Sequence, residues 1–249
     1  MDKAFIQAEA TRAFDCIKGG GVAILALDLS YAIGSNTQES VERVIRAKRR
    51  PAEKTNGGPG NIELSKELHI LGERHHEMIR AVTVDYNLPL TVCAPVRMDH
   101  PYMRAMDPWV LERSTKDGTF SLLINGGPLL DALVPMSLDQ LCPIVGSSAN
   151  ISLQGCNFTL ESIEPEIRAV ADVETNLGLS KYYNPAGTGS TILSFPNLEV
   201  IRFGVFYDKI RDIFDSEFKQ ELPQRGRWVH KDQMEAAAAA GLSTDGGPA

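Results

Sequence analysis

The chain has 249 residues, of which 43% are hydrophobic, and a net charge of −7. This size and composition can supply a full hydrophobic core, so they exclude a chain that is disordered over most of its length. The negative charge disfavours nonspecific DNA binding, and no apolar run approaches the roughly 18 residues of a membrane span, which favours a cytoplasmic protein without a membrane partner.

In chain order, the first predicted element is a helix over residues 3–17, where apolar side chains recur at helical spacing until three glycines follow. A continuous apolar run over 22–27 predicts a buried strand, and its end, residues 28–31, is expected to open onto a loop over residues 34–36. Asn36 and Glu39 resemble a capping box, which predicts a second helix that continues until a proline interrupts the pattern. A basic segment would then lie at the C-terminal end of that helix.

The rest of the chain alternates between strand-like and helix-like patterns, which predicts the α/β class with a twisted, mostly mixed open sheet flanked by helices. The predicted helices are residues 65–84, residues 128–133, a helix near 159, and residues 207–218. The predicted strands are residues 88–94, 119–124, 190–193 and 198–203, and an apolar run over 141–145 leads into a polar turn. One domain over 1–222 is expected, followed by a tail over 223–249 whose composition predicts disorder.

Cysteine and histidine spacing predicts no metal site. The four cysteines lie far apart without a CxxC pair, which favours reduced, buried thiols. His69 and His76 lack the HExxH spacing of a zinc site, so a solvated helix face is predicted for them. Residues 98–107 contain an Asp-His pair and three methionines, and they are expected to form a loop over the functional site.

A basic segment interrupts this acidic chain between residues 42 and 54. It contains six Lys or Arg and two Glu, which gives it a local charge of +4. Lys48, Arg50 and Lys54 are spaced so that long cationic side chains beyond a helix end can converge on one polyphosphate. The alternative is a solvated basic helix end, and the segment alone does not distinguish the two.

Two polar segments further along the chain have the composition of anion-binding loops. Ser147-Ser148-Ala149-Asn150 follows an apolar run and offers hydroxyl, amide and backbone N–H groups to phosphate or ribose oxygens. An ordinary Asx turn is the alternative there. The segment Gly187-Thr188-Gly189-Ser190-Thr191 leads into a predicted strand and allows an anion to approach the backbone closely.

The order and spacing of these segments resemble the YrdC-type family, which includes threonylcarbamoyl-adenylate synthases. The resemblance extends over about residues 4–210. The matching segments are Gly20-Gly21, residues 26–33, Lys48-x-Arg50-Pro51 with Lys54, residues 88–91, Ser148-Ala149-Asn150-Ile151-Ser152, Ser190-Thr191-Ile192 and Arg202-Phe203-Gly204.

The resemblance implies a YrdC-like fold whose concave basic face holds ATP and an amino acid, with Mg²⁺ as cofactor and bicarbonate as co-substrate. It implies a catalytic role, on phosphate and carbamate charge, for Lys48, Arg50 and Lys54. It implies nucleotide binding by Ser148, Asn150, Ser190, Thr191 and Arg202. It implies substrate contacts by Leu27, Asp28, Leu29 and Tyr31.

Three departures from the family pattern concern the substrate. Leu27 and Leu29 replace two threonines, and an apolar side chain cannot hydrogen-bond a hydroxylated amino acid, so an amine other than threonine is an alternative. Leu123 stands where the family tends to have a cation. The glycine-rich segment 57–60 is predicted to be an insertion that changes a lid or the substrate pocket.

Three functions stay open from the sequence. The first is ATP-dependent formation of a carbamoyl-adenylate from bicarbonate and an amino acid or amine, with release of pyrophosphate. The second is a noncatalytic module that binds a nucleotide or RNA, and the third is a carbamoyl transferase acting on a small molecule. Small molecules are the expected partners, because the net charge gives RNA no support.

Overall fold

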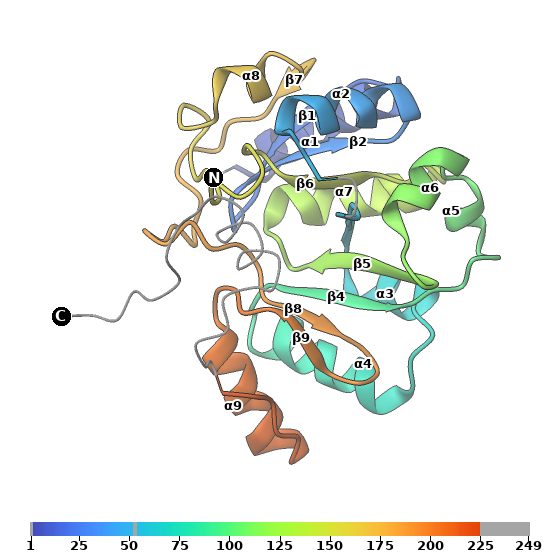
Figure 1. Ribbon diagram of the computed structural model, residues 1–249, viewed down its shortest axis with the longest axis vertical. Coiled ribbons are helices and arrows are strands. Elements are labelled where there is room, and N and C mark those ends of the chain that lie inside the picture. The colour runs from blue at the N-terminus through green and yellow to red at the C-terminus, as the bar shows by residue number, and fades with distance from the viewer. Residues whose placement is uncertain (1, 52–53, 225–249) are drawn as a thin grey trace.

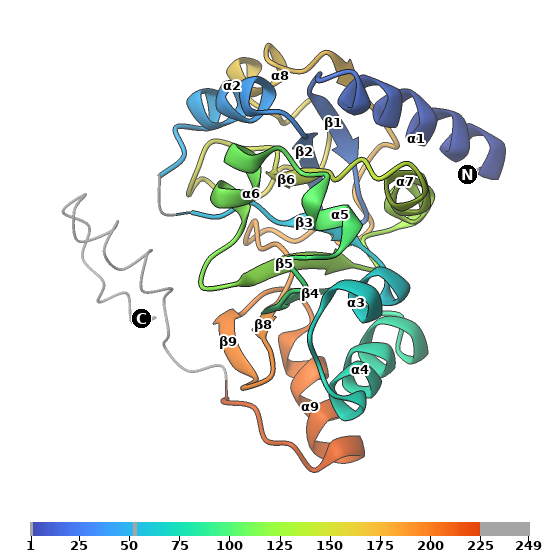
Figure 2. The same ribbon diagram turned by 90° about the vertical axis from the view of Figure 1, so that its right-hand side faces the viewer.

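The computed structural model describes residues 2–51 and 54–224, and within them the chain forms two mixed β-sheets flanked by helices (Figures 1 and 2). The first sheet has the order β6-β2-β1-β7, and the second has the order β3-β5-β4-β8-β9. These elements confirm the predicted α/β class with mixed strands and flanking helices. The predicted single open sheet is instead divided into two.

The strands of the first sheet are β1 (Ala23–Ala26), β2 (Tyr31–Ser35), β6 (Val145–Ser148) and β7 (Val173–Glu174). Helices α1 (Lys3–Lys18) and α7 (Pro128–Asp139) pack together on one face of this sheet, and α2 (Gln38–Lys48) and α8 (Pro165–Arg168) lie on the other (Figure 2). The first face buries Phe14 and Ile17 of α1, at the helical spacing that the sequence predicted.

The strands of the second sheet are β3 (Gly58–Gly60), β4 (Leu90–Pro95), β5 (Thr119–Ile124), β8 (Ile192–Ser194) and β9 (Glu199–Arg202). Its covered face carries α3 (Ile62–Leu68), α4 (Glu73–Arg80) and α9 (Tyr207–Phe218) (Figure 2). A π-helical turn, η1 (Ala81–Asp85), extends α4, and two short helices, α5 (Pro101–Arg104) and α6 (Pro108–Ser114), lie between β4 and β5. Along β5, buried residues alternate with half-buried ones, so one face is more open than the other.

One pair of glycines joins the two sheets. The Gly57 N–H donates to the Gly146 carbonyl at 3.2 Å, and the Gly146 N–H donates back to Gly57 at 2.7 Å. A Cβ on Gly146 would lie 2.6 Å from the carbonyl oxygen of Ile33, and one on Gly58 would lie 2.9 Å from the Phe120 ring. The glycine-rich segment is therefore the strand β3 and its junction, and its prediction as an insertion that changes a lid or the substrate pocket stays a prediction.

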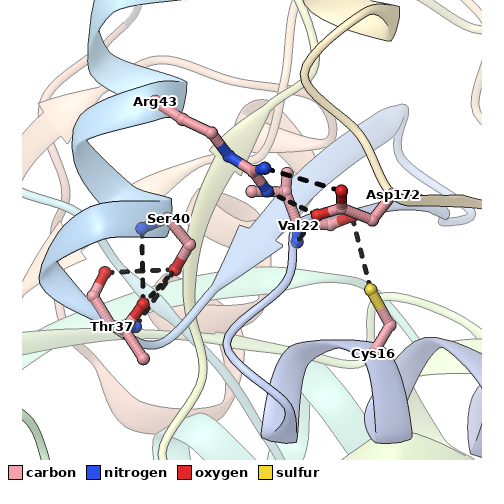
Figure 3. Close-up of polar contacts among 6 residues, drawn as sticks. All are labelled: Cys16, Val22, Thr37, Ser40, Arg43 and Asp172. Atoms are coloured by element: carbon pink, nitrogen blue, oxygen red, sulfur yellow. Dashed lines mark hydrogen bonds and ion pairs between the residues drawn. The ribbon is translucent and has the colours of Figure 1, made fainter.

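A second junction ties the first sheet to its helices at Asp172. Its carboxylate accepts from the Val22 backbone N–H at 2.8 Å and from the guanidinium of Arg43 on α2 (Figure 3). The Cys16 thiol of α1 donates to the Val22 carbonyl oxygen at 3.6 Å in the same cluster. The Arg43 guanidinium lowers the pKa of the Asp172 carboxyl below its usual value. The segment before β7 is thus fixed to both α2 and the start of β1.

Several predicted boundaries differ from the structure. Residues 31–35 form β2 in a hairpin with β1, although residues 34–36 were expected to form a loop. The helix cap lies one residue later than predicted, at Thr37, whose side chain exchanges hydrogen bonds with Ser40 (Figure 3). The predicted helix over 65–84 is broken between α3 and α4, the helix predicted over 128–133 extends to Asp139, and the one predicted near 159 is confined to α8.

Two further predictions are wrong, one about the histidines and one about residues 98–107. His69 is fully buried, with Nδ1 3.0 Å from Ser65 Oγ and Nε2 3.2 Å from the Phe120 carbonyl oxygen, and burial lowers its pKa to about 4. His76 is also buried, so neither lies on a solvated helix face. Residues 98–107 form α5 and the cap of α6 with Met103 in the core, where a loop over the site was expected.

Most of the predicted tail lies outside the described residues. Of residues 223–249, the structure describes Pro223 and Gln224, and the Pro223 carbonyl accepts from the Tyr207 hydroxyl. The boundary at 222 stays a prediction. In residues 2–51 and 54–224, no helix combines the length and the apolar character that crossing a membrane requires.

Candidate functional site

The structure brings the basic segment into contact with the Ser-Ala-Asn turn through Lys48. This residue ends α2, and Arg49 then adopts a left-handed conformation that stops the helix. The Lys48 side chain is 1% exposed, and its ammonium donates to the Ser148 carbonyl and, at 2.6 Å, to the Asn150 carbonyl. The Lys48 carbonyl also accepts from the Ser152 N–H at 3.0 Å. The end of α2 is therefore fixed to the turn that follows β6.

Burial makes Lys48 an easily deprotonated lysine. Desolvation is the main reason why its pKa falls to about 7, and the positive charges of Arg50 and Lys54 lower it further. The Cys156 and Glu164 side chains act in the opposite direction. Charges affect a pKa in this way only from nearby, so Arg50 and Lys54, the other two predicted cations of the basic segment, lie close to Lys48.

Arg50 is the second largely buried cation of this cluster. One guanidinium nitrogen donates to the Thr55 carbonyl at 2.7 Å, while its buried Nε has no hydrogen-bond partner. Burial lowers the pKa of Arg50 to about 10. Lys54 lies at the end of the same short connection, where its N–H donates to the Pro51 carbonyl at 3.2 Å. We call Lys48, Arg50, Ser148 and Asn150 the first wall.

Unpartnered polar atoms gather along the first wall. Ser147 Oγ, Asn150 Oδ1 and Ser152 Oγ are all buried without a hydrogen-bond partner, and Asn150 is only 5% exposed. Buried polar atoms are normally paired, so a group of unpaired ones marks a position for a polar ligand or for water. Because these atoms belong to the turn that Lys48 contacts, the local chemistry suits an anion with additional hydrogen-bonding groups.

Arg202, Ser190 and Thr191 form what we call the second wall. The Arg202 Nε donates to the Ser190 carbonyl at 2.8 Å, and another guanidinium nitrogen donates to Ser190 Oγ at 2.9 Å. Ser190 Oγ also lies 2.7 Å from the Thr91 hydroxyl. Thr191 is fully buried, and its hydroxyl donates to the Val205 carbonyl at 2.9 Å. Burial lowers the pKa of Arg202, so the second wall also contains a desolvated cation.

Cys156 connects the two walls, and the sequence patterns did not identify it as a site residue. Its side chain interacts electrostatically with both Lys48 and Arg202, and its N–H donates to the Gly187 carbonyl at 2.8 Å. The Cys156 sulfur would lie 3.3 Å from a Cβ placed on Gly189. In the sequence, only its position shortly after Asn150 indicates that Cys156 could belong to the site. The spacing between the cysteines does not indicate it.

The four predicted substrate residues are less closely grouped. Leu29 and Tyr31 are buried, and the Tyr31 hydroxyl lies 3.0 Å from Asn176 Oδ1 and 2.9 Å from the Gly178 carbonyl oxygen. The Tyr31 backbone nevertheless adjoins the first wall, since its carbonyl accepts from the Ala149 N–H at 2.8 Å. Leu27 and Asp28 line a separate pocket at the end of β1. The substrate roles of all four stay predictions.

Leu123, which occupies the place of an expected cation, lies beside the second wall. In the antiparallel pair of β4 and β5 it is opposite Thr91, whose hydroxyl contacts Ser190. Cross-strand neighbours of this kind have side chains on the same face of the sheet. The surface next to Ser190 is therefore apolar at this position.

The family resemblance implies a magnesium ion, which a bound nucleotide would bring with it. In the part of the chain that the structure describes, no three His, Cys, Asp or Glu side chains gather in a way that could hold a metal ion. Mg²⁺ in nucleotide sites is commonly held by phosphate oxygens together with one or two carboxylates and water. Lys48, Arg50 and Arg202 would meet the remaining phosphate charge.

Comparisons with known proteins identify structural neighbours. No protein-family model matches this sequence, and no curated protein sequence is significantly similar to it. A hypothetical protein, smu.1377c, from Streptococcus mutans superposes with a TM-score of 0.65 at 17% identity, over 84% of this chain and 92% of that one. E. coli YciO superposes with a TM-score of 0.57 at 19% identity, over 82% of this chain and 91% of its own.

The third neighbour is P. abyssi Sua5, which has also been solved complexed with L-threonine. A doubly substituted variant of Sua5 superposes with a TM-score of 0.64 at 19% identity, over 85% of this chain and 57% of that one. The chain thus spans little more than half the length of Sua5. Identities this low are informative about architecture, and these neighbours show that the chain has a YrdC-like fold.

Proposed function

We propose that the chain binds ATP between the first and second walls and forms a carbamoyl-adenylate from bicarbonate and an amine. The observation that carries this proposal is that two desolvated cations, Lys48 with Arg50 beside it and Arg202, both interact with Cys156. The Glu164 carboxylate raises the pKa of Lys48 without restoring it to its usual value, so a polyanionic ligand would compensate charge that burial leaves unsolvated. HypF, a structural neighbour that superposes with a TM-score of 0.55 at 15% identity over 75% of this chain and 27% of that one, was solved in a phosphate- and nucleotide-bound form, which supports a nucleotide as the ligand.

The chemistry needs little from general acids or bases. Bicarbonate and an amine combine with loss of water to give a carbamate, whose oxygen then attacks the α-phosphorus while pyrophosphate leaves. Negative charge develops on the phosphoryl oxygens, so positioned cations and backbone N–H groups are what lower the barrier. Bound Mg²⁺ would supply further charge neutralisation to the phosphates.

Each wall has a part in this scheme that follows from its contacts. Lys48 has three N–H donors, and two are directed at the Ser148 and Asn150 carbonyls, which leaves the third for a phosphate or carbamate oxygen. Asn150 Oδ1 would accept from a ribose hydroxyl, and the Ser147 hydroxyl would donate to a phosphate oxygen. Arg202 would contribute charge from the second wall while it holds Ser190 in position.

The test is a turnover assay with the whole chain. The protein is incubated with ATP, Mg²⁺ and labelled bicarbonate, with and without a panel of amino acids and amines, and pyrophosphate and labelled adenylate are followed. Pyrophosphate release that requires both bicarbonate and one class of amine is expected. Release that is unaffected by every amine, with ATP still bound, would remove the synthetase function.

A noncatalytic role in binding a nucleotide or RNA is the second candidate, and Leu123 is the observation that favours it. An apolar side chain opposite Thr91 gives no charge to a reacting group on that side of the second wall. On this alternative, ATP binds with the same cations but no adenylate forms. The same assay separates the two candidates, because binding without turnover is its distinguishing outcome.

A further inference from the structure

Glu164 is a half-buried residue that lies next to the first wall without belonging to it. It directly precedes α8, which packs against α2 (Figure 2), and its carbonyl accepts from the backbone N–H groups of Ile167 and Arg168. Its side chain gives no hydrogen bond to the helix that it precedes. The carboxylate is directed instead at the turn that follows β6, and no step of the proposed function uses it.

Both carboxylate oxygens of Glu164 hold the Ser-Ala-Asn turn. Oε1 accepts from the backbone N–H of Ile151 at 3.3 Å, and Oε2 accepts from Asn157 Nδ2 at 2.9 Å. The same amide nitrogen of Asn157 donates to the Ala149 carbonyl at 2.9 Å, so Asn157 links the carboxylate to a second peptide group of the turn. Hydrogen bonds to an ionised acceptor are stronger than those to a neutral one. The turn is therefore anchored to Glu164 at two of its peptide groups.

The peptide group between Asn150 and Ile151 lies between a cation and an anion. Its carbonyl accepts from the Lys48 ammonium at 2.6 Å, and its N–H donates to the Glu164 carboxylate. This peptide bond is trans, so its C=O and N–H point in opposite directions. Lys48 and Glu164 consequently lie on opposite sides of the peptide group, and its dipole is aligned favourably with both charges.

Four neighbouring groups act on the charge of Lys48. Burial is the main reason why its pKa is low, and Arg50 and Lys54, which follow α2, lower the pKa further. Cys156 and Glu164, which follow the turn, act in the opposite direction. Glu164 is the only carboxylate among these four groups, so it is the one that can offset the positive charge of the basic segment.

From these contacts we propose that Glu164 is a positioning residue of the nucleotide site. Its carboxylate fixes the direction of the peptide groups in the turn, and it favours the ammonium form of Lys48, which then offers a charged donor to a phosphate oxygen. It acts through the turn and Asn157, to which both of its oxygens are directed. The inference rests on the proposed function only in that the ligand is a nucleotide, and the coupling of Glu164 to Lys48 can be measured without any ligand.

Titration of Lys48 in the absence of nucleotide is the first test. Isotope-edited NMR of lysine-labelled protein follows each lysine side chain, and the signal that is missing in Lys48→Met belongs to Lys48. Glu164→Gln keeps the side-chain length and one acceptor oxygen but loses the charge, so the titration midpoint of Lys48 should fall by about half a pH unit or more. Glu164→Asp keeps the charge on a shorter side chain, so its midpoint should lie between those of the unchanged chain and Glu164→Gln.

Glu166→Gln is the matched control for this titration. Glu166 lies in the first turn of α8 and pairs with Arg49 at 3.1 Å between exposed side chains. The variant therefore removes the same charge close to the basic segment without affecting the hydrogen bonds of the turn, and the midpoint of Lys48 should stay unchanged. Thermal unfolding confirms that each variant is folded. A midpoint that is unaffected by Glu164→Gln, or lowered equally by Glu166→Gln, would overturn the inference.

The pH dependence of ATP binding is the second test. Between about pH 6 and about pH 8, the affinity of Glu164→Gln for ATP should fall about threefold more than that of the unchanged chain, because its Lys48 loses the proton at a lower pH. If Glu164 only held the turn, the variant would lose the same factor at both pH values, and that result would contradict the part assigned to its charge. If ATP does not bind to the unchanged chain, the proposed function fails, whereas the titration of Lys48 still decides whether Glu164 acts on it.

Discussion

The ammonium nitrogen of Lys48 lies 2.6 Å from the backbone carbonyl oxygen of Asn150, although the two residues are 102 positions apart in the chain. A lysine in this environment is held by neutral carbonyls and lies near other cations, so its charged form is not favoured. Its protonation state therefore becomes sensitive to any anion that binds beside it. This property leads to the first prediction.

Nucleotide binding should take up a proton between about pH 7 and pH 9. In the free protein the pKa of Lys48 is about 7, so at pH 8 this lysine is mostly neutral. A bound polyphosphate favours the ammonium form and raises the pKa, so Lys48 gains a proton when the nucleotide binds. Calorimetry in buffers of different ionisation enthalpy should give an uptake approaching about one proton. The apparent affinity should fall as the pH is raised above 7.

Replacing Lys48 should remove this proton uptake together with most of the affinity. In Lys48→Met the Ser148 and Asn150 carbonyls lose their donor, which should lower the free energy of unfolding by about 1–3 kcal/mol. Nucleotide affinity should fall at least tenfold. Arg46→Met is the matched control, because Arg46 is an exposed residue of α2 that pairs with Glu42 at 3.4 Å. An unchanged proton uptake in the Lys48 variant would show that another group titrates.

Alkylation should identify Cys156 as a residue of the nucleotide site. This thiol is partly exposed and lies near both Lys48 and Arg202. A bulky adduct such as that of N-ethylmaleimide should block nucleotide binding, and bound ATP should protect Cys156 from the reagent. Peptide mapping by mass spectrometry separates Cys156 from the partly exposed Cys16 and Cys93. If modified Cys156 leaves ATP binding intact, the two walls do not enclose the ligand as described.

Gly146 should tolerate no side chain. A Cβ there would lie 2.6 Å from the Ile33 carbonyl oxygen, and the obstacle is backbone that cannot rotate away. Gly146→Ala should lower the free energy of unfolding by about 1–3 kcal/mol in denaturant titrations. Gly72→Ala is the control, since its Cβ would meet nothing closer than 3.9 Å. A Gly146→Ala protein as stable as this control would contradict the close packing of β6 on β2.

The Asp172 ion pair should contribute to stability in a defined pH range. The pKa of this carboxyl is lowered from 3.8, so its contribution is present above that value and is lost as the pH falls through the lowered one. Asp172→Asn keeps an acceptor for the Val22 N–H but loses the charge that faces Arg43. The side chains are 33% and 47% exposed, so the loss at pH 7 should not exceed about 1 kcal/mol.

The difference between the Asp172→Asn variant and the unchanged chain should shrink as the pH is lowered from 5 to 2, as measured by chemical denaturation at each pH. A difference that stays constant over this range would mean that the carboxylate acts by packing and not by its charge. Raising the salt concentration at pH 7 should also reduce the difference, because partly exposed charges are screened.

The sequence was sufficient where local patterns determine the structure. The apolar spacing of α1 predicted its buried face, and the strand β5 and the helix α9 begin and end where their patterns do. It was insufficient where tertiary contacts override local preference. Gly58–Gly60 has the composition of a loop, yet Phe120 and Leu122 leave room only for glycine against β5, so these residues form a strand.

The candidate site could be predicted only in part, because tertiary contacts decide which of its side chains are buried. Order along the chain grouped Lys48 with Ser148 and Asn150, and their hydrogen bonds show that this grouping is spatial. Sequence could not show that Lys48 is buried, because a lysine in a basic run normally lies in solvent. It also gave no sign of Lys181, whose ammonium lies 3.7 Å from Asp28 Oδ2 although the two residues are far apart in the chain.

The glycine pair at the junction of the sheets has a mechanical consequence for the site. Ser148 and Asn150 continue from the four-stranded sheet, whereas Arg202 and Ser190 belong to or adjoin the five-stranded one. The Gly57–Gly146 pair is therefore one of the connections that fix the distance between the two sets of cations, together with the hydrogen bond from the Cys156 N–H to the Gly187 carbonyl. A side chain at position 146 that pushes this pair apart should therefore change the width available to a polyphosphate, although position 146 itself would not touch the ligand.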